Sequence, residues 1–239
     1  MSPNSWRLAP ELDSAWVSTL LTRAGVPHFF SRKLAPSADT IAHRLAGACA
    51  RPARAKQVHG ARFVRAQECL GPSLPEADAV LNDSPALVPM VTSADCVSVL
   101  IWCAHSKSCA AVHAGWRGLI ADSIGAAVRG MIEQFGAEPS AMVAALGPCA
   151  GADAYEVGGD VIDEFVRHGL GTCVREGTRP GKALADCALA ARLRLRAAGL
   201  ADAAIEASGI CTISDVRCAS HRRESTNPAR MLSAIAIPV

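Results

Sequence analysis

The sequence predicts a protein of the α/β or α+β class that forms one domain. Short runs rich in β-branched residues alternate along the chain with longer stretches whose apolar residues recur at helical spacing. Glycine and proline punctuate all 239 residues, and neither an internal repeat nor a low-complexity linker interrupts them. We therefore expect residues 1–239 to fold as a single domain with a full hydrophobic core.

Residues 1–136 are expected to hold two helices and three strands. Residues 39–50 have helical spacing, and the strands are expected at 88–91, 97–102 and 110–113, which are short runs rich in β-branched and apolar residues. Residues 119–135 then predict a long helix, because Ile120, Ile124, Val128 and Met131 fall on one apolar stripe. Gly136 is the expected end of that helix.

The second half repeats the alternation of strands and helices. A strand is expected at 142–146, helices at 160–168 and 183–198, and further strands at 205–213 and 231–239. Gly199 follows the second of these helices and is a typical helix stop. Tyr155 and Glu156 follow a glycine-rich turn and are expected to open a helix, where an acidic residue is ordinary and Glu156 could also serve as an acid or base.

Composition excludes several classes of protein. Half of the chain is hydrophobic and 19% is charged, which is typical of a folded protein. The net charge of +2 is too even for an affinity based on nucleic-acid phosphates, and no run is long enough for a membrane span. Glu11 and Asp13 stand where a signal peptide would be apolar, and the ten cysteines form no CxxC pair. We expect a cytoplasmic protein whose cysteines are thiols.

Three residues at the edges of strand-like runs could bind a metal: His59 in KQVHG, Cys96 in ADCV and His113 in AVHAG. Their separations of 37 and 17 residues exclude a zinc finger, whose ligands come in close pairs. They fit a catalytic site in which two imidazoles and a thiolate hold Zn²⁺ and leave a fourth position open. Each residue taken singly could instead be a buried histidine or thiol of the core.

Two further segments could bind a small anion. In HAGWRG, Gly115 and Gly118 allow close backbone approach before the long predicted helix, and Arg117 adds a fork of donors. A tight turn with a surface arginine would explain the same residues. In SHRRE, the adjacent Arg222 and Arg223 point to different faces, so at most one should face a given site. A solvated turn is the alternative there.

Taken in order, six blocks resemble the signature of the bacterial YfiH-like family: KQVHG, ADCVSVL, AAVHAGWRGL, ALGPCAGADAYEVG, SGICT and SHRRE. Members of that family carry the names multicopper polyphenol oxidase or laccase, purine nucleoside phosphorylase and peptidoglycan editing factor. The resemblance implies a mixed sheet flanked by helices, of the kind shared with cytotoxic necrotising factor deamidases. It also implies that His59, Cys96 and His113 hold one zinc ion, with Cu²⁺ as the alternative metal.

The resemblance also implies roles for other residues. His59, Cys96, His113 and Arg117 would be catalytic, and substrate would be bound by Gln57, Arg117, Arg222 and Arg223. The chain departs from the family at three places. The S-x-N-L-G element is missing after HFFSRKLAPSADT, the aromatics of F-F-S-Y-R-R-D-G are replaced in CASHRRES, and Ser98 replaces the proline of ADC-x-P. The residues that match the family's metal ligands are kept, whereas residues that line its substrate site are changed. This implies a changed specificity or a weak activity.

Counting histidines excludes a multicopper laccase. The copper sites of such an enzyme need more histidines than the seven present, largely in H-x-H pairs, and the chain has no H-x-H. The resemblance instead favours zinc-dependent phosphorolysis of adenosine, inosine or methylthioadenosine, with adenosine deamination as a side activity. The alternatives are an amidase that edits a peptidoglycan precursor and a catalytically weak zinc-binding protein. The expected partners are a purine nucleoside and phosphate, and the expected state is a monomer without nucleic-acid or membrane partners.

Overall fold

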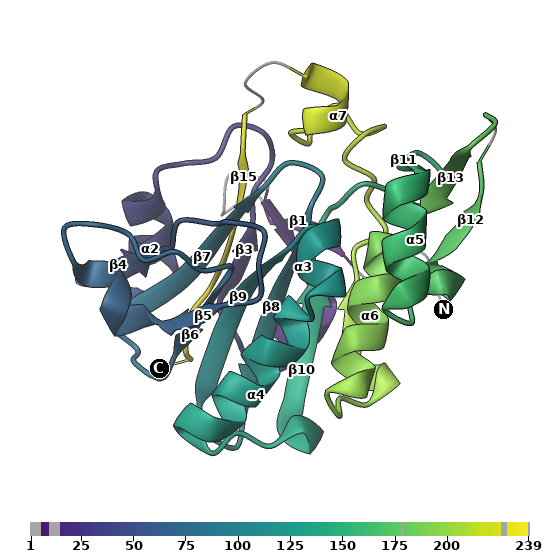
Figure 1. Ribbon diagram of the computed structural model, residues 1–239. Helices are drawn as coiled ribbons and strands as arrows, with labels where there is room; N and C mark the ends of the chain where they lie inside the picture. Colours follow the sequence, from purple (N-terminus) through teal and green to yellow (C-terminus); the bar gives the residue numbers. More distant parts are fainter. Residues whose placement is uncertain (1–5, 10–14, 178, 226–228, 239) are drawn as a thin grey trace.

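Two six-stranded sheets lie against each other in the computed structural model, which describes residues 6–9, 15–177, 179–225 and 229–238 (Figure 1). The central sheet contains both parallel and antiparallel neighbours, since β10 pairs with β14 and β5 with β6 in parallel while the other pairs are antiparallel. This confirms the mixed α/β architecture. Its strands are, in spatial order, β14 (Ile205–Ala207), β10 (Met142–Leu146), β8 (Val97–Cys103), β9 (Ser108–Ala114), β6 (Ala79–Asn82) and β5 (Phe63–Arg65).

The second sheet covers one face of the central sheet. Its strands are β1 (Arg7–Ala9), β2 (Ala15–Val17), β3 (His28–Phe30), β15 (Met231–Ile235), β7 (Leu87–Ser93) and β4 (Arg51–Ala53). Helix α2 (Ala38–Ala46) packs on the outer face of this sheet through Ile41 and Ala42, and the short α1 (Thr19–Arg23) joins β2 to β3. Strand β4, which contains Pro52, lies at the edge of this sheet. Proline has no N–H to donate to a neighbouring strand, and an edge position needs fewer such hydrogen bonds.

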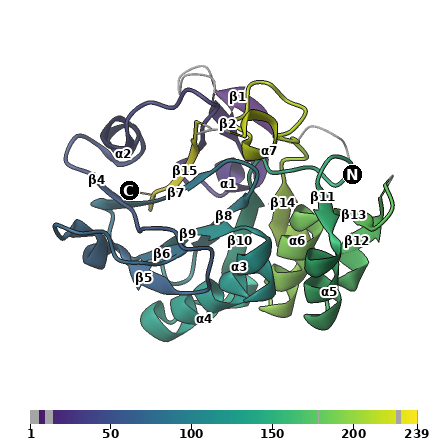
Figure 2. The same ribbon diagram turned by 45° about the horizontal axis from the view of Figure 1, so that its top comes forward.

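Helices cover the other face of the central sheet, so that Figure 2 shows successive layers of helices, sheet, sheet and α2. These helices are α3 (Trp116–Ile120), α4 (Ser123–Phe135) and α6 (Cys187–Ala197). Beside them lie α5 (Gly159–Arg167) and a small sheet of β11 (Glu156–Gly158), β13 (Lys182–Ala185) and β12 (Val174–Glu176). The remaining helices are α7 (His221–Glu224) and the 3₁₀ turns Ala66–Leu70, Pro139–Ala141, Gly171–Cys173 and Asp202–Ala204.

The two sides of β8 face two different hydrophobic clusters. Val99 and Ile101 are buried among the helices, whereas Leu100 and Trp102 are buried between the two sheets. This alternation follows from the pleat, which sends successive side chains to opposite faces. A strand buried on both sides is mostly apolar, which explains the nearly continuous apolar run there. Its polar residue, Ser98, is buried, and its hydroxyl accepts a hydrogen bond from that of Ser233 at 2.8 Å.

Four expected elements differ in the structure. The helix predicted over 119–135 is two helices, because Asp122 takes a left-handed conformation and its side chain accepts a hydrogen bond from the N–H of Gly125. The helix predicted over 183–198 begins at Cys187, since the preceding residues form β13 and Asp186 caps α6 through the N–H of Leu189. Glu156 opens strand β11 rather than a helix, and the strand expected over 205–213 ends at Ala207.

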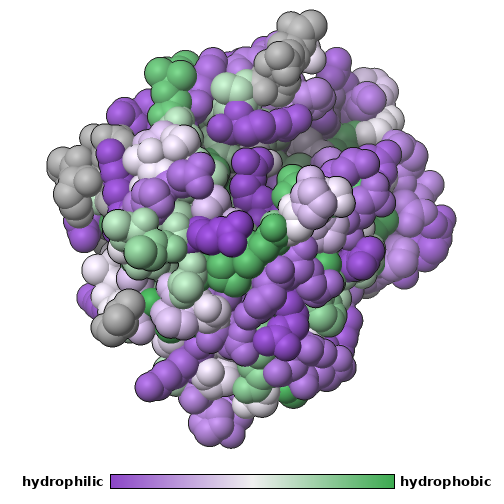
Figure 3. All heavy atoms as spheres, turned by 90° about the vertical axis from the view of Figure 1, so that its left-hand side faces the viewer, coloured by the Kyte–Doolittle hydropathy of each residue, from purple (hydrophilic) through white to green (hydrophobic). Residues whose placement is uncertain are grey.

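The other elements fall close to their expected places. Helix α2 ends at Ala46, a turn earlier than predicted, because Gly47 follows with a positive φ of 90°. The last strand ends at Ile235, and Val239 lies outside the described residues. No helix in the described part of the chain has the length and apolar character needed to cross a membrane. The face nearest α2 and β4 is largely hydrophilic, with apolar side chains in small patches (Figure 3).

Candidate metal centre

His59, Cys96 and His113 meet at one end of the central sheet. Their potential ligand atoms all lie within 4.8 Å of one another, and the two imidazole rings stand nearly perpendicular with centroids 4.8 Å apart. His113 is buried, Cys96 is partly buried and His59 is exposed. The three residues that the sequence singled out therefore form one cluster, open to solvent on the side of His59.

Antiparallel pairing of β8 with β9 brings two of the three together. Ser98 pairs with His113 and Val97 with Ala114, so the residue just before β8 and the last residues of β9 share one end of the sheet. Cys96 therefore lies beside His113 although 17 residues separate them. Asp95, which precedes the cysteine, has a φ of 87° and turns the chain into the strand.

Asp78 holds the third residue in place and was not expected from the sequence. Its carboxylate accepts hydrogen bonds from the backbone N–H groups of Val58, His59 and Gly60 at 3.2, 2.9 and 2.7 Å. The same carboxylate accepts a hydrogen bond from His113 Nδ1 at 2.9 Å. These bonds fix the loop that carries His59 at a φ of 61°, and they leave His113 Nε2 free to bind a metal.

The charges of the cluster favour a thiolate. Burial raises the pKa of the Cys96 thiol, but hydrogen bonds and charge from His113 and His59 outweigh it and lower that pKa to about 6. Burial lowers the pKa of His113, whereas Asp78 and Cys96 together raise it to about 9. A negatively charged sulfur between two imidazoles is the arrangement that a divalent cation would stabilise by replacing the proton.

The start of α3 approaches the cluster closely. A Cβ atom on Gly115 would lie 2.9 Å from Cys96 Sγ and 3.2 Å from His59 Cδ2, so only glycine fits beside these two side chains. Gly118, the other glycine singled out in HAGWRG, lies within α3, where a Cβ would stand 3.1 Å from Ser123 Oγ. The close backbone approach expected from the sequence is therefore real, and Gly115 provides it against the cluster itself.

A cleft of about 590 Å³ opens over the cluster. Among the described residues, its basic lining side chains are those of Arg54, Lys56, Arg117, Arg222 and Arg230, and the one lining carboxylate is that of Asp95. Asp95 accepts hydrogen bonds from the hydroxyl of Thr212 at 2.6 Å and from the N–H of Arg222 at 2.7 Å. The cleft is therefore electropositive and suited to a negatively charged ligand.

Two arginines of the cleft lie on aromatic rings. The guanidinium of Arg117 is 4.2 Å from the ring centroid of Trp116, and that of Arg222 is 4.9 Å from the ring centroid of Tyr155. The Arg222 guanidinium also donates to the carbonyl of Glu156 at 2.8 Å, whereas it is the backbone N–H of Arg222 that bonds to Asp95. Among the described residues neither guanidinium forms an ion pair with a carboxylate. Helix α7, which carries Arg222, lies at the upper end of the molecule in Figure 1, above α3. The two arginines keep donors available to a ligand.

Two of the expected substrate-binding residues have structural partners. Gln57 lines the cleft, but its side-chain amide is bonded to both the N–H and the carbonyl of Thr92, each at 2.8 Å. Arg223 is outside the cleft lining and donates to backbone carbonyls, including that of Thr212 at 2.6 Å. Only one arginine of the pair faces the cluster, as their adjacency predicts.

The donor set and its surroundings fit a zinc ion. Zinc sites use imidazole nitrogen and thiolate sulfur, and a ligating histidine usually donates its second N–H to a carboxylate, as His113 does to Asp78. Copper also accepts these ligands. Within the described residues this is the one group of three histidine, cysteine or acidic side chains that could hold an ion.

Comparison with known proteins identifies the family. A family model described as "Multi-copper polyphenol oxidoreductase laccase" matches residues 33–238. The chain belongs to this family. Relatives in this laccase-like family include a protein of Xylella fastidiosa named purine nucleoside phosphorylase, 39% identical over 71% of this chain. The chain spans 66% of the length of that relative. A Deinococcus radiodurans protein of the same name is 35% identical over 78% of this chain and 70% of its own length.

Two solved structures share the fold of this chain. The crystal structure of Bacillus licheniformis YfiH aligns with a TM-score of 0.84, at 23% identity, over 98% of this chain and 99% of that chain. YlmD from Geobacillus stearothermophilus aligns with a TM-score of 0.82, also at 23% identity, over 100% of this chain and 98% of that chain. The YfiH-like resemblance of the sequence blocks is thus confirmed at the level of family and fold.

Proposed function

We propose that this chain is a zinc-dependent purine nucleoside phosphorylase. Adenosine, inosine and methylthioadenosine are its substrates in this proposal, and adenosine deamination is a side activity. The names of the relatives support the reaction class. The observation that carries the proposal is the pair of arginines stacked on Trp116 and Tyr155 beside the metal cluster, because phosphorolysis needs a site for a phosphate dianion next to the reacting centre.

His59, Cys96 and His113 would hold the metal, and when bound it would supply a Lewis acid that polarises substrate oxygen and stabilises developing charge. The protein as purified should then contain about one zinc ion per chain. Metal analysis of His59→Ala and His113→Ala should show that most of this zinc is lost. Full zinc occupancy in both variants would mean that the ligands are assigned wrongly.

The chain's own residues would position the two reactants. Arg117 and Arg222 lie on aromatic faces that restrict their side chains, so their remaining donors can bind phosphate with little loss of side-chain entropy. The ring of Tyr155 belongs to the same cleft, and burial raises its pKa to about 12, so the phenol stays protonated and can donate a hydrogen bond at neutral pH. The cleft volume of about 590 Å³ accommodates a nucleoside and phosphate together.

Phosphate-dependent turnover tests the proposal. Adenosine, inosine and methylthioadenosine would each be incubated with the zinc-loaded protein, with and without phosphate, and the sugar product identified. We expect pentose 1-phosphate and a requirement for phosphate. Equal cleavage without phosphate, with free pentose released, would contradict phosphorolysis. Amino acid release from a peptidoglycan precursor would indicate the editing amidase, and turnover of neither class would indicate a weak zinc-binding protein.

A variant of Arg117 separates phosphate binding from nucleoside binding. Arg117→Ala should raise the KM for phosphate by about tenfold and change the KM for the nucleoside much less, since a hydrogen bond to a charged group is worth about 1.5–3 kcal/mol. The matched control is Arg167→Ala, because Arg167 lies on α5 outside the cleft lining and pairs with Glu164. Steady-state kinetics with each substrate varied in turn provide both constants. An unchanged KM for phosphate would remove Arg117 from the proposed phosphate site.

A further inference from the structure

Two cysteines outside the metal cluster face each other on neighbouring segments. Cys149 follows β10 and Cys211 follows β14, and the two are partners in an isolated parallel bridge. The N–H of Cys149 donates to the carbonyl of Ile210 at 3.2 Å, and the N–H of Thr212 donates to the carbonyl of Cys149 at 2.9 Å. Both thiols are free. The bridge is separate from the β10–β14 ladder, which ends with Leu146 opposite Ala207, and its register differs from that of the ladder by one residue.

The bridge places the two side chains within reach of a covalent bond. Neighbouring strands lie about 4.8 Å apart, and a disulfide joins residues whose Cα atoms are about 4.4–6.8 Å apart. Directly paired residues also project their Cβ atoms to the same side of the sheet. Both cysteines line one cavity of about 500 Å³. A disulfide between them therefore needs side-chain rotation but no rearrangement of the backbone pairing.

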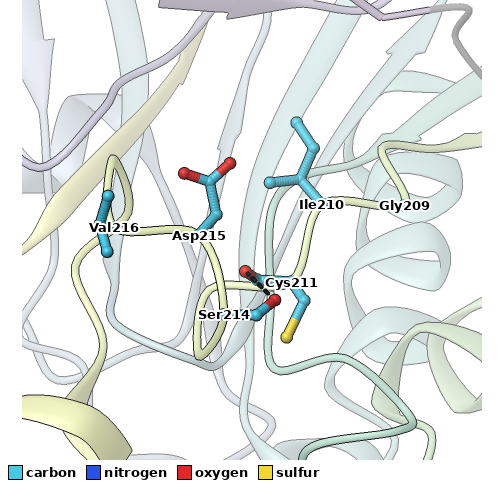
Figure 4. Close-up of a pocket in the computed structure, with 6 residues that line it drawn as sticks. All are labelled: Gly209, Ile210, Cys211, Ser214, Asp215 and Val216. Atoms are coloured by element: carbon cyan, nitrogen blue, oxygen red, sulfur yellow. Dashed lines mark hydrogen bonds between the residues drawn. The ribbon is translucent and has the colours of Figure 1, made fainter.

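The two thiols differ in exposure and in acidity. Cys211 also lines the shallow pocket of Figure 4, beside Ser214, whereas Cys149 is buried. Burial raises the pKa of Cys211, but hydrogen bonds from Ser214, Gly151 and Ile213 outweigh it and lower that pKa. Burial raises the pKa of Cys149 to about 12. An accessible, more acidic thiol beside a buried one is the arrangement of a redox-sensitive pair.

We propose that Cys211 and Cys149 form a peroxide-sensitive dithiol that closes to a disulfide. In the first step the Cys211 thiolate attacks one oxygen of hydrogen peroxide, the O–O bond breaks, and hydroxide leaves to give a sulfenic acid at Cys211. In the second step Cys149 sulfur attacks the Cys211 sulfur, the S–O bond breaks, and the proton of Cys149 leaves with the hydroxyl as water. The hydroxide of the first step takes up the proton that the Cys211 thiol lost when it ionised. The two thiols are thus oxidised, and the peroxide is reduced to two molecules of water.

The dithiol is linked to the metal cluster through Asp95. The N–H of Ala150, next to Cys149, donates to the carbonyl of Asp95 at 2.9 Å, and the hydroxyl of Thr212, next to Cys211, donates to its carboxylate at 2.6 Å. Asp95 in turn precedes the proposed ligand Cys96. Cys211 Sγ accepts the N–H of Gly151 at 3.2 Å, and turning toward Cys149 breaks that bond. We therefore expect oxidation to loosen this loop and to speed zinc release, an effect that rests on the proposed zinc site.

Peptide mapping tests the dithiol without reference to zinc or activity. The full zinc-loaded chain would be treated with hydrogen peroxide, unreacted thiols blocked, and the peptides compared with and without reduction. We expect a linked peptide pair that contains Cys149 and Cys211 and that is absent from both Cys211→Ser and Cys149→Ala. Cys49→Ser is the matched control, because Cys49 is exposed and lies outside both cavities. Overoxidation of Cys211 without the linked pair would overturn the proposal.

Zinc release measures the coupling separately. A colorimetric chelator would follow zinc loss from wild-type protein and from Cys211→Ser after the same peroxide treatment. Direct oxidation of Cys96 would release zinc from wild-type protein and from Cys211→Ser alike. The difference between their two release rates therefore measures the effect of the Cys149–Cys211 disulfide. We expect faster release from the wild type. Equal rates with the linked peptide present would make the coupling to the metal cluster wrong, whereas absence of zinc from untreated protein would contradict the proposed function and not the dithiol.

Discussion

At the residue scale, one buried carboxylate positions two members of the cluster formed by His59, Cys96 and His113. Asp78 is 1% exposed, and it connects the backbone of the His59 loop with the ring of His113. The sequence identified the three residues of the cluster, because each stands at the edge of an apolar run beside residues that are unusual choices for a core. It did not reveal Asp78, because a single aspartate before an apolar run is also typical of an ordinary turn.

Replacing Asp78 should weaken metal binding without removing a ligand. Asp78→Asn keeps the shape of the side chain but loses its charge and turns one acceptor oxygen into a donor facing N–H groups. We expect zinc affinity to fall by about 10- to 100-fold, as for other partners of ligating histidines. Competition with a chelator of known affinity measures this, and Asp83→Asn, an exposed residue paired with Arg65, is the control. Zinc affinity equal to that of wild type would show that Asp78 has only a local structural role.

The reactivity of Cys96 distinguishes a metal ligand from a nucleophile. As a ligand, its sulfur is committed to the metal, so iodoacetamide should not modify it in the zinc-loaded protein. After zinc removal the alkylation rate should rise with pH around a midpoint of about 6, the pKa that the two histidines impose on the thiol. Mass-spectrometric mapping identifies the labelled residue, with the exposed Cys49 as the internal standard. Fast labelling of Cys96 in active, zinc-loaded enzyme would show that it is the nucleophile.

At the element scale, the sequence placed well the elements whose apolar pattern extends over their whole length, and it missed the three-residue strands and the helix caps. Strand β10 and helix α5 lie within one residue of their predicted places, because their apolar patterns extend over whole elements. Strands β1 to β5 are three residues each and too short to show a period. The two helix errors share one cause: Asp122 and Asp186 are N-caps inside apolar stretches, and apolar periodicity does not detect a cap.

The C-terminal end of α3, where the chain breaks before α4, is hydrogen-bonded to a residue of α6. Arg194 of α6 donates to the carbonyl of Leu119 at 2.9 Å and so binds the end of α3. This contact stabilises a helix of only five residues whose first turn approaches the metal cluster. No local pattern could predict it, because 75 residues separate the two partners.

The close approach of α3 to the cluster predicts a strict requirement for glycine. In Gly115→Ala the new methyl group would lie 2.9 Å from Cys96 Sγ, so either the thiolate or the helix start must move. We expect most of the zinc to be lost while circular dichroism stays close to that of wild type. Gly159→Ala is the matched control, because a Cβ there meets no heavy atom within 4 Å. A Gly115→Ala protein with a full complement of zinc would rule out a ligand role for Cys96 at the position described here.

At the scale of the whole molecule, the central sheet belongs to two hydrophobic clusters at once. Leu100 and Ile101 are neighbours on β8, both fully buried, and they face opposite layers. Neither layer can lose its packing without exposing one face of β8, the strand that directly follows Cys96. We therefore propose that the chain unfolds as a single cooperative unit, as expected for one domain.

Cavity variants on the two faces of β8 test this cooperativity. Leu100→Ala removes packing between the two sheets, and Ile101→Ala removes packing under the helices; each should lower the free energy of unfolding by about 2–5 kcal/mol. Urea unfolding would be followed by far-ultraviolet circular dichroism, which reports both layers, and by tryptophan fluorescence, which is weighted towards Trp6, Trp16 and Trp102 between the sheets. For one cooperative unit both probes shift together in both variants, because the strand transmits the loss from either face. If Ile101→Ala moved the dichroism transition and left the fluorescence transition unchanged, the helical layer would unfold independently and the single-domain proposal would be wrong.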